Sequence, residues 1–422
     1  MRLFKRACWW LWIALTLVIL FLNFRLYAPS VLPRDNRELP KTILAQLKSN
    51  RSAIDRGAPD RMQSLFPEGY YFCYAMHGLT WVNVALRDET YTDQAIAEAT
   101  WCLDHLESEQ GKAAFPPRLP PECGMFYSTW KTHLLSGIAL LEKGQNSDRI
   151  EKLRNDCDQI VDALNHSSTP FLPSYVGQAW PCDSTPGIHA LKTCDHVTGE
   201  ARYQTTIEKW LQKSKTIVDP ETGLTPHLTH HLSGQPRQGA RATSQVIILR
   251  FLADIDPEFA NEQYELFQSQ FYSPLLGLPG VREYPIGTQG SGDVDSGLLI
   301  FKRSLSATVF AIGTAQVFGD TEQAEAISAC GEAIGFPWTW NQSKSYVGKL
   351  LPIGDVMVAY NQSALPWLVA DDRPLPQPKP IPFWWRWPTH AISALVFIPF
   401  LIRLRRRKAQ QSQDRAEKDT QN

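Results

Sequence analysis

The sequence lacks a charge imbalance, paired cysteine motifs and strand-like alternation, and each absence excludes a class of protein. Its 42 basic and 43 acidic residues give a net charge of −1, and no basic face stands out, so we expect no nucleic-acid partner. The 8 cysteines are scattered without a CxxC pair, which argues against a zinc site and a dense disulfide framework. No Walker loop, dinucleotide fingerprint or GxSxG elbow is present. Alternation of apolar and polar residues is nearly absent, which favours an all-α fold.

Two apolar segments lie near the ends of the chain. The first, at 7–27, follows three cations and carries tryptophans at one end and a tyrosine at the other, as expected of a helix that spans about 30 Å of hydrocarbon. A cleaved signal peptide is the alternative, but no A-x-A-like site follows. The second, at 384–402, begins with a tryptophan cluster and runs into RLRRRK, although a buried core helix would also explain it. Because cationic flanks stay in the cytoplasm, we expect both termini there.

The sequence therefore predicts a protein of the cell inner membrane whose main domain is periplasmic, with the lipid bilayer as one partner. The predicted regions are a cytoplasmic N-terminus at 1–6, a transmembrane helix at 7–27, an extracytoplasmic domain at 28–374, a Pro-rich connector at 375–383, a transmembrane helix at 384–402, and a basic, then polar cytoplasmic tail at 403–422.

Between the spans, apolar residues recur at helical spacing in twelve segments. These are 41–55, 70–87, 92–107, 125–142, 149–164, 184–195, 202–216, 241–253, 258–270, 296–317, 321–334 and 353–362. Short polar connections alternate with long connections rich in proline, glycine and aromatic residues, and in a series of antiparallel hairpins every second connection lies at the same end. The pattern predicts an all-α, (α/α)6 barrel or toroid whose long loops gather at one mouth. The helices that follow those loops would point their N-termini at this mouth.

Carboxylates stand at the ends of two long loops. Asp183 lies at a predicted helix start, and Glu283, Asp293 and Asp295 crowd into a glycine-rich stretch. Neighbouring carboxylates raise one another's pKa, which keeps a general acid protonated beside a base, so we predict that these residues are catalytic. Helix N-caps at Asp183 and Asp295 are the structural alternative. A calcium loop is a third hypothesis, but the remaining ligands are missing.

Other side chains in or beside the long loops are predicted to bind substrate. They are Tyr70, His77, Tyr175, Trp180, His227 and Arg241. His77 could instead be a core histidine. His227 lies near two further histidines, yet no HExxH-like spacing is present, so we expect no metal. No cofactor motif appears, and we expect none.

From about residue 65 to 370 the chain resembles the linalool dehydratase/isomerase family. The resemblance rests on six segments in the family's order: EGYYFCYAMHGL, HLLSGIALLEKG, IEKWLQKSKTIVDPETG, FLADIDPEFANEQY, VREYPIGTQGSGDVDSG and KSYVGKLLPIGDVMVAY. It implies an (α/α)6 barrel and a cofactor-free acid–base enzyme that acts on a hydroxyl-bearing substrate. Tyr70 falls on a family active-site tyrosine.

Other family positions differ in this chain. Lys131 stands where the family has an active-site histidine, and Ser174 and Asp183 stand near its two cysteines. Cys182, beside Asp183, is included among the expected substrate-binding residues. The family's early aspartate and tyrosine have no match in 50–69.

Three functions follow as hypotheses. The first is acid–base dehydration, isomerisation or cleavage of a small hydroxylated molecule. The second is a glycoside hydrolase or lyase of envelope polysaccharide, because aromatic and carboxylate-rich loops suit sugars. The third is a degenerate barrel that binds a ligand or acts as a scaffold. Protein partners are not predicted.

Overall fold

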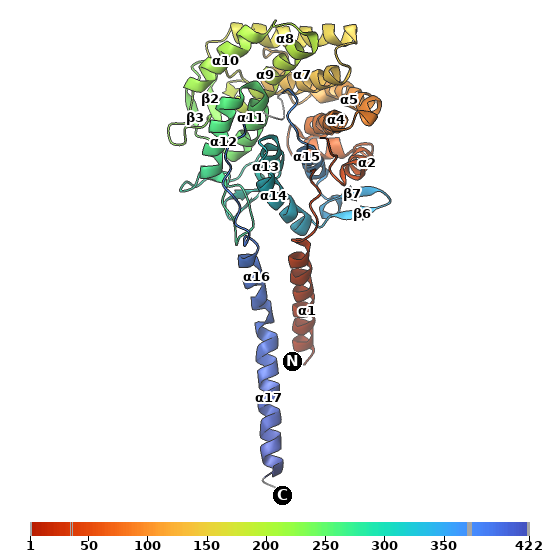
Figure 1. Ribbon diagram of the computed structural model, residues 1–422, viewed down its shortest axis with the longest axis vertical. Coiled ribbons are helices and arrows are strands. Elements are labelled where there is room, and N and C mark those ends of the chain that lie inside the picture. Colours follow the sequence, from red (N-terminus) through yellow and green to blue (C-terminus); the bar gives the residue numbers. More distant parts are fainter. Residues whose placement is uncertain (1, 34, 36, 369–373, 420–422) are drawn as a thin grey trace.

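The computed structural model describes residues 2–33, 35, 37–368 and 374–419, and these are mostly helical. Six buried helices form an inner set: α4 (Gly69–Arg87), α7 (Gly124–Leu141), α9 (Pro181–Thr198), α11 (Ala242–Ile255), α13 (Leu305–Val317) and α15 (Pro352–Gln362). Each packs against the next, and α15 packs against α4, so the contacts close a ring (Figure 1). These helices are buried on nearly every side because they contact neighbours all round.

A second set of helices covers the ring: α2 (Ile43–Ile54), α5 (Thr92–Glu107), α8 (Ser147–Asn165), α10 (Gln204–Thr216), α12 (Pro257–Phe271) and α14 (Thr321–Ile334). They are amphipathic and bury one stripe only. The short connections supply their N-caps, as when the side chains of Asn146, Asp256 and Asp320 accept backbone hydrogen bonds from α8, α12 and α14. Short helices occupy some of the remaining connections: α3 (Ala58–Gln63), η1 (Glu89–Tyr91), α6 (Glu109–Lys112) and η2 (Val347–Lys349).

The long loops carry short strands that the sequence did not predict. β1 (Gln178–Ala179), β2 (Leu228–His230) and β3 (Pro236–Gln238) form one antiparallel sheet, β4 (Leu299–Ile300) pairs with β5 (Arg303–Ser304), and β6 (Trp338–Trp340) pairs with β7 (Ser343–Ser345). The predicted helix at 296–317 is therefore wrong at its start. Phe301 and Lys302 have positive φ and form the turn between β4 and β5, so α13 begins only at Leu305.

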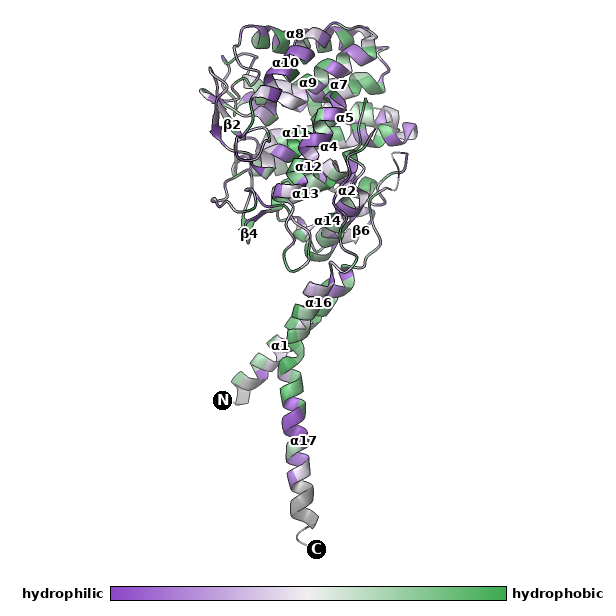
Figure 2. Cartoon of the chain, turned by 60° about the vertical axis from the view of Figure 1, so that its left-hand side comes forward, coloured by the Kyte–Doolittle hydropathy of each residue, from purple (hydrophilic) through white to green (hydrophobic). Residues whose placement is uncertain are grey.

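Two helical segments extend from the domain on one side (Figures 1 and 2). They are α1 (Arg2–Arg25) and the run α16 (Trp387–Ala394), η3 (Leu395–Phe397) and α17 (Ile398–Asp419). Arg6–Arg25 and Trp387–Gln413 are each long and apolar enough to cross a membrane. Almost none of their side chains is buried, which excludes the core-helix alternative for the second segment. Of the predicted regions, 369–373 and 420–422 lie outside the described residues.

Polar side chains join the two segments. Trp12 Nε1 donates to the Val396 carbonyl over 2.9 Å, and Asn23 Nδ2 donates to Ser393 Oγ over 2.8 Å. His390 hydrogen-bonds both Asn23 and Tyr27. These contacts hold α1 and the α16–α17 run side by side.

Candidate functional site

The long loops meet at one end of the ring. The Tyr175 hydroxyl, in the loop before α9, hydrogen-bonds Glu68, which directly precedes α4. β1, in the same loop, pairs with β2, in the loop before α11. The Met125 amide, at the start of α7, donates to the Pro173 carbonyl over 3.1 Å. The N-termini of four inner helices are thus tied to one set of loops.

Asp183 lies in the first turn of α9, but it does not cap that helix. Trp180 occupies the N-cap position, and the Asp183 carboxylate instead accepts hydrogen bonds from the Ser174 hydroxyl and, over 3.5 Å, from the Cys182 thiol. The expectation of an N-cap at Asp183 is therefore wrong. Burial raises the pKa of Asp183 to about 7, with help from the charges of Asp295 and Glu68, although the two hydrogen bonds act in the opposite direction.

Asp295 and Glu68 lie close enough to Asp183 to influence its ionisation. Asp295 has solvent-exposed area, yet the surrounding protein desolvates its carboxyl, and together with the charges of Asp293 and Glu68 this raises its pKa to about 6. Ser304, and not Asp295, caps α13 through a hydrogen bond from the Ala307 amide, so an N-cap role for Asp295 is wrong. Desolvation, followed by the charge of Glu68, raises the pKa of Tyr175, whose hydroxyl therefore stays protonated.

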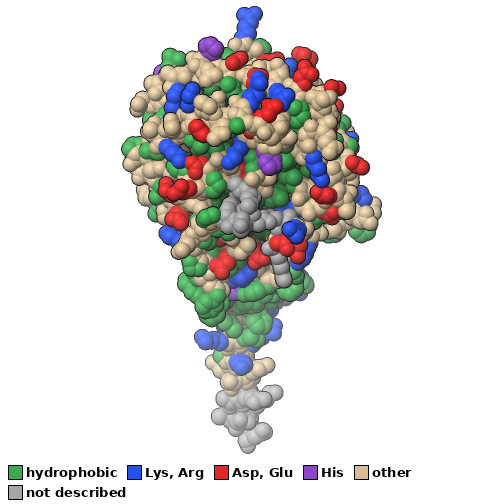
Figure 3. Space-filling view, turned by 45° about the horizontal axis from the view of Figure 1, so that its top comes forward, with side chains coloured by type: hydrophobic (Ala, Val, Ile, Leu, Met, Phe, Trp, Pro, Cys, Tyr) green, Lys and Arg blue, Asp and Glu red, His purple; other side chains and the backbone are tan. Residues whose placement is uncertain are grey.

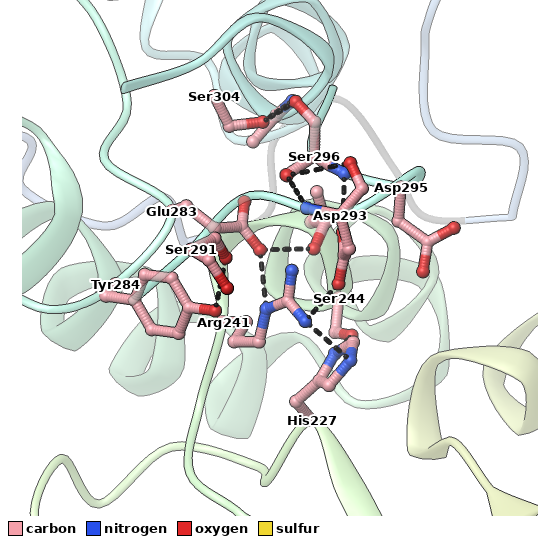
Figure 4. Close-up of polar contacts among 12 residues, drawn as sticks. His227, Arg241, Ser244, Glu283, Tyr284, Ser291, Asp293, Asp295, Ser296 and Ser304 are labelled. Carbon is pink, nitrogen blue, oxygen red and sulfur yellow. Dashed lines mark hydrogen bonds and ion pairs between the residues drawn. The ribbon is translucent and has the colours of Figure 1, made fainter. Parts of the chain in front are cut away.

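Arg241 organises the second carboxylate group. It occupies the N-cap position of α11 and forms ion pairs with Glu283 at 2.7 Å and with Asp293 at 2.5 Å (Figure 4). The Glu283 side chain is 0% exposed, so this charge needs the guanidinium. Burial acts to raise the pKa of Asp293, but hydrogen bonds from Arg241 and Ser296 outweigh it and lower the value to about 2. Figure 4 shows the Asp295 carboxylate pointing away from Arg241, and the two neighbouring aspartates therefore differ in pKa.

A series of polar contacts runs from Arg241 towards Asp183. Arg241 Nη1 lies 3.3 Å from His227 Nε2, and because a guanidinium can only donate, Nε2 must accept. The His227 proton then lies on Nδ1 and is donated to the Ser244 hydroxyl. Burial and the charge of Arg241 lower the pKa of His227 to about 3, so the ring is neutral.

The series continues from α11 to α9. Ser244 lies close enough to Cys182 to act against the rise in the pKa of its thiol, and this thiol donates to Asp183. Burial raises the pKa of the Cys182 thiol well above its usual value, which keeps the thiol protonated as this donation requires. The donors on either side of this contact, from Arg241 to Ser244 and from Cys182 to Asp183, point in the same direction, and the last of them helps to orient the Asp183 carboxylate.

A cavity of about 420 Å³ opens beside Arg241 and Asp293. Its lining is dominated by polar side chains: Asp219, Glu221, Gln238, Arg241, Tyr284, Thr288, Ser291 and Asp293. The volume is in the range of small-molecule sites, and the density of donors and acceptors suits a ligand with several hydroxyl groups.

The remaining predicted residues have different surroundings. Trp180 packs edge-on against Tyr175, with ring centroids 6.0 Å apart. Tyr70 packs on Tyr74 within α4, and His77 is buried 3.5 Å from Glu98 of α5. Their predicted role in substrate binding receives no support from these contacts.

Lys131, at the family's histidine position, forms an ion pair with Asp156 on α8 at 2.9 Å. No group of three or more His, Cys, Asp or Glu in the described part of the chain is arranged to hold a metal ion. All eight cysteines are free.

Sequence reasoning missed Glu68 and Ser244. Glu68 becomes part of the site through a hydrogen bond to Tyr175, 107 positions further along the chain, which no local pattern reveals. The one indication in the sequence was an acidic residue directly before the first inner helix. Ser244 could have been found in the same way, in the first turn of the helix that Arg241 opens.

The chain matches no protein-family model and no curated protein. Among solved structures it is similar to a polysaccharide lyase, with 12% identity and a TM-score of 0.43 over 75% of this chain and 97% of the lyase. It is also similar to a D-mannose isomerase, with 9% identity and a TM-score of 0.43 over 81% of this chain and 95% of the isomerase. Likeness at this level carries no argument about function, which has to come from the site itself.

Proposed function

We propose that this chain is a membrane-anchored, extracytoplasmic (α/α)6 barrel enzyme that performs general acid–base chemistry on a hydroxylated small molecule. The observation that carries the proposal is the buried Asp183 carboxyl, oriented by Ser174 and Cys182, with the partly exposed Asp295 close by. The circuit of inner helices supports the barrel, and the two apolar helices support the anchor.

The two carboxyls suit complementary roles. Dehydration needs one group that protonates the departing hydroxyl and another that removes a proton from the adjacent carbon. Asp183 is the acid in this proposal, because its pKa of about 7 leaves it substantially protonated at neutral pH. Asp295, with a lower pKa of about 6 and exposed area, is the base. Tyr175, held by Glu68, donates a hydrogen bond to the substrate.

The relation to the linalool dehydratase/isomerase family is part of the proposal. Ser174 and Asp183 stand near the family's two cysteine positions, and here they hydrogen-bond each other. A hydroxyl and a carboxyl thus stand near the positions of the family's sulfur atoms, and the reaction would differ in detail from that of the family.

A glycan is the second substrate class. The polar lining of the cavity beside Arg241 favours it, because a sugar presents many hydroxyl groups to such a surface. Asp183 and Asp295 would then serve glycosidic cleavage or elimination, and Arg241 would position the sugar through Asp293.

Solvent isotope exchange tests the proposal even when the reaction product is unidentified. Full-length protein is incubated in D₂O with hydroxylated terpenoids, other small alcohols and oligosaccharides, and mass spectrometry detects deuterium incorporation, loss of water or chain cleavage. Asp183→Asn should lower the rate by on the order of 10²-fold or more, because a proton-transferring group is removed. Asp256→Asn, the same change at the N-cap of α12, should not.

The outcomes separate the hypotheses. Full activity in Asp183→Asn would refute the acid–base assignment. Binding of a candidate ligand without any exchange or cleavage would support a degenerate, ligand-binding barrel.

A further inference from the structure

The β6–β7 hairpin exposes aromatic surface that the domain itself does not use. Trp338 and Trp340 are 65% and 73% exposed, and the whole of β6 faces solvent. Leu350 and Leu351, which follow η2, are exposed as well. Contiguous apolar surface of this kind on a folded domain marks an interaction site.

The opposite strand fixes the hairpin in place. Lys344 of β7 is buried and forms an ion pair with Glu332 of α14 at 2.7 Å. The Tyr346 hydroxyl, just beyond β7, donates to the same carboxylate over 2.6 Å. Asn341 and Gln342 both have positive φ, as a two-residue hairpin turn requires. The tryptophans therefore project from a rigid support.

The same glutamate connects the hairpin to α1. Arg25, the last residue of α1, forms an ion pair with Glu332 at 3.3 Å and also donates to its backbone carbonyl. One carboxylate thus contacts both the end of the first apolar helix and the base of the hairpin. Figures 1 and 2 both place β6 at the end of the domain from which α1 and α16 extend. In Figure 3, hydrophobic side chains gather where the domain narrows towards these helices, whereas charges of both signs are interspersed elsewhere.

We propose that the β6–β7 hairpin inserts Trp338 and Trp340 into the interfacial layer of the lipid bilayer beside α1. The proposal rests on the membrane anchoring proposed above and adds a third contact to the two spans. Tryptophan favours the headgroup region, because its ring is apolar and its indole N–H still finds a polar partner there.

Site-directed spin labelling of the full-length protein tests the contact. In a Cys8→Ser background, which removes the one exposed cysteine, Trp338→Cys and, separately, Trp340→Cys are labelled and reconstituted into phosphatidylcholine vesicles. Leu232→Cys is the matched control, because Leu232 is also 65% exposed and follows β2, far from the spans in both ribbon views. Collision with oxygen, which concentrates in lipid, is compared with collision with a water-soluble nickel chelate.

We expect the ratio of oxygen to nickel collisions to be several-fold higher at positions 338 and 340 than at position 232. Equal ratios in protein that floats with the vesicles would overturn the hairpin contact and leave the anchoring intact. Protein that does not float would overturn both.

Discussion

At the scale of single residues, Asp183 makes a prediction that needs no substrate. Its pKa is about 3.9 in an unfolded chain and about 7 in the folded protein. Between these values the folded state keeps a proton that the unfolded state has lost, so the stability of the fold falls as the pH rises through this window. Above pH 7 the full cost of holding an ionised, buried carboxylate is present.

Asp183→Asn cannot ionise and should escape this loss. From pH 5 to pH 8 its stability relative to the wild type should rise by about 2–3 kcal/mol, since one pKa unit corresponds to about 1.36 kcal/mol. Thermal unfolding of both proteins in detergent at the two pH values measures the difference. Asp256→Asn is the control, and its offset from the wild type should change little with pH. A constant offset for Asp183→Asn would show that its carboxyl titrates normally.

Residue identity alone identified part of this site. Asp183 and Asp293 were predictable because carboxylates at the ends of long, aromatic-rich loops are uncommon as packing residues. The opposite pKa shifts of Asp293 and Asp295 were not, because they depend on which carboxylate meets Arg241. Glu68 and Ser244 join the site through tertiary contacts only.

At the scale of elements, helical periodicity located the ring helices and most of their ends within a few residues. It failed where backbone conformation, and not apolar spacing, decides the outcome. The β4–β5 turn interrupts an apolar stretch that reads as helix, because Phe301 and Lys302 adopt positive φ. Strands of two or three residues, such as β1 and β6, are too short to produce any period.

Two glycines in helices give a matched prediction about packing. At Gly313 of α13 an added Cβ would lie 2.6 Å from Asn361 Oδ1 and 2.7 Å from Arg250 Nη1, whereas at Gly331 of α14 nothing lies within 4 Å. Gly313→Ala should therefore lower stability by about 1–3 kcal/mol through overpacking. Gly331→Ala should raise it by about 0.5–1 kcal/mol, because alanine favours the helix.

Thermal unfolding of the two alanine variants distinguishes packing from propensity. The Arg250–Asn361 hydrogen bond at 3.1 Å holds in place the two side chains that a Cβ at position 313 would meet. If both variants were stabilised, these side chains would have room to move away from Gly313. If both variants were destabilised, the Gly331→Ala result would indicate that other atoms lie against Gly331, where the structure shows open space.

At the scale of the whole molecule, the arrangement of the two apolar helices constrains how the chain can cross a membrane. Both leave the domain on the same side (Figure 1), and hydrogen bonds from Asn23 and Trp12 join α1 to Ser393 of α16 and Val396 of η3. A polar side chain such as Asn23 costs little in a bilayer when a neighbouring helix satisfies it. The domain therefore lies on one side of any membrane that both helices cross, and the outer ends of the two helices lie on the other side.

The cationic residues at the outer ends of both helices predict which side of the membrane is cytoplasmic. Arg2, Lys5 and Arg6 precede the first span, and the block at 403–408 follows the second. Since such residues remain in the cytoplasm, reporter fusions after residue 200 should be active outside the cytoplasm and fusions after residue 408 should be active inside it. Replacement of the cations in the block at 403–408 by glutamate should make the orientation of the second span less uniform and leave that of the first span unchanged.

A fusion after residue 408 that reports outside in the unmodified chain would show that the second helix does not cross. Trp12 and Asn23 of a membrane-spanning α1 would then lose their partners Val396 and Ser393.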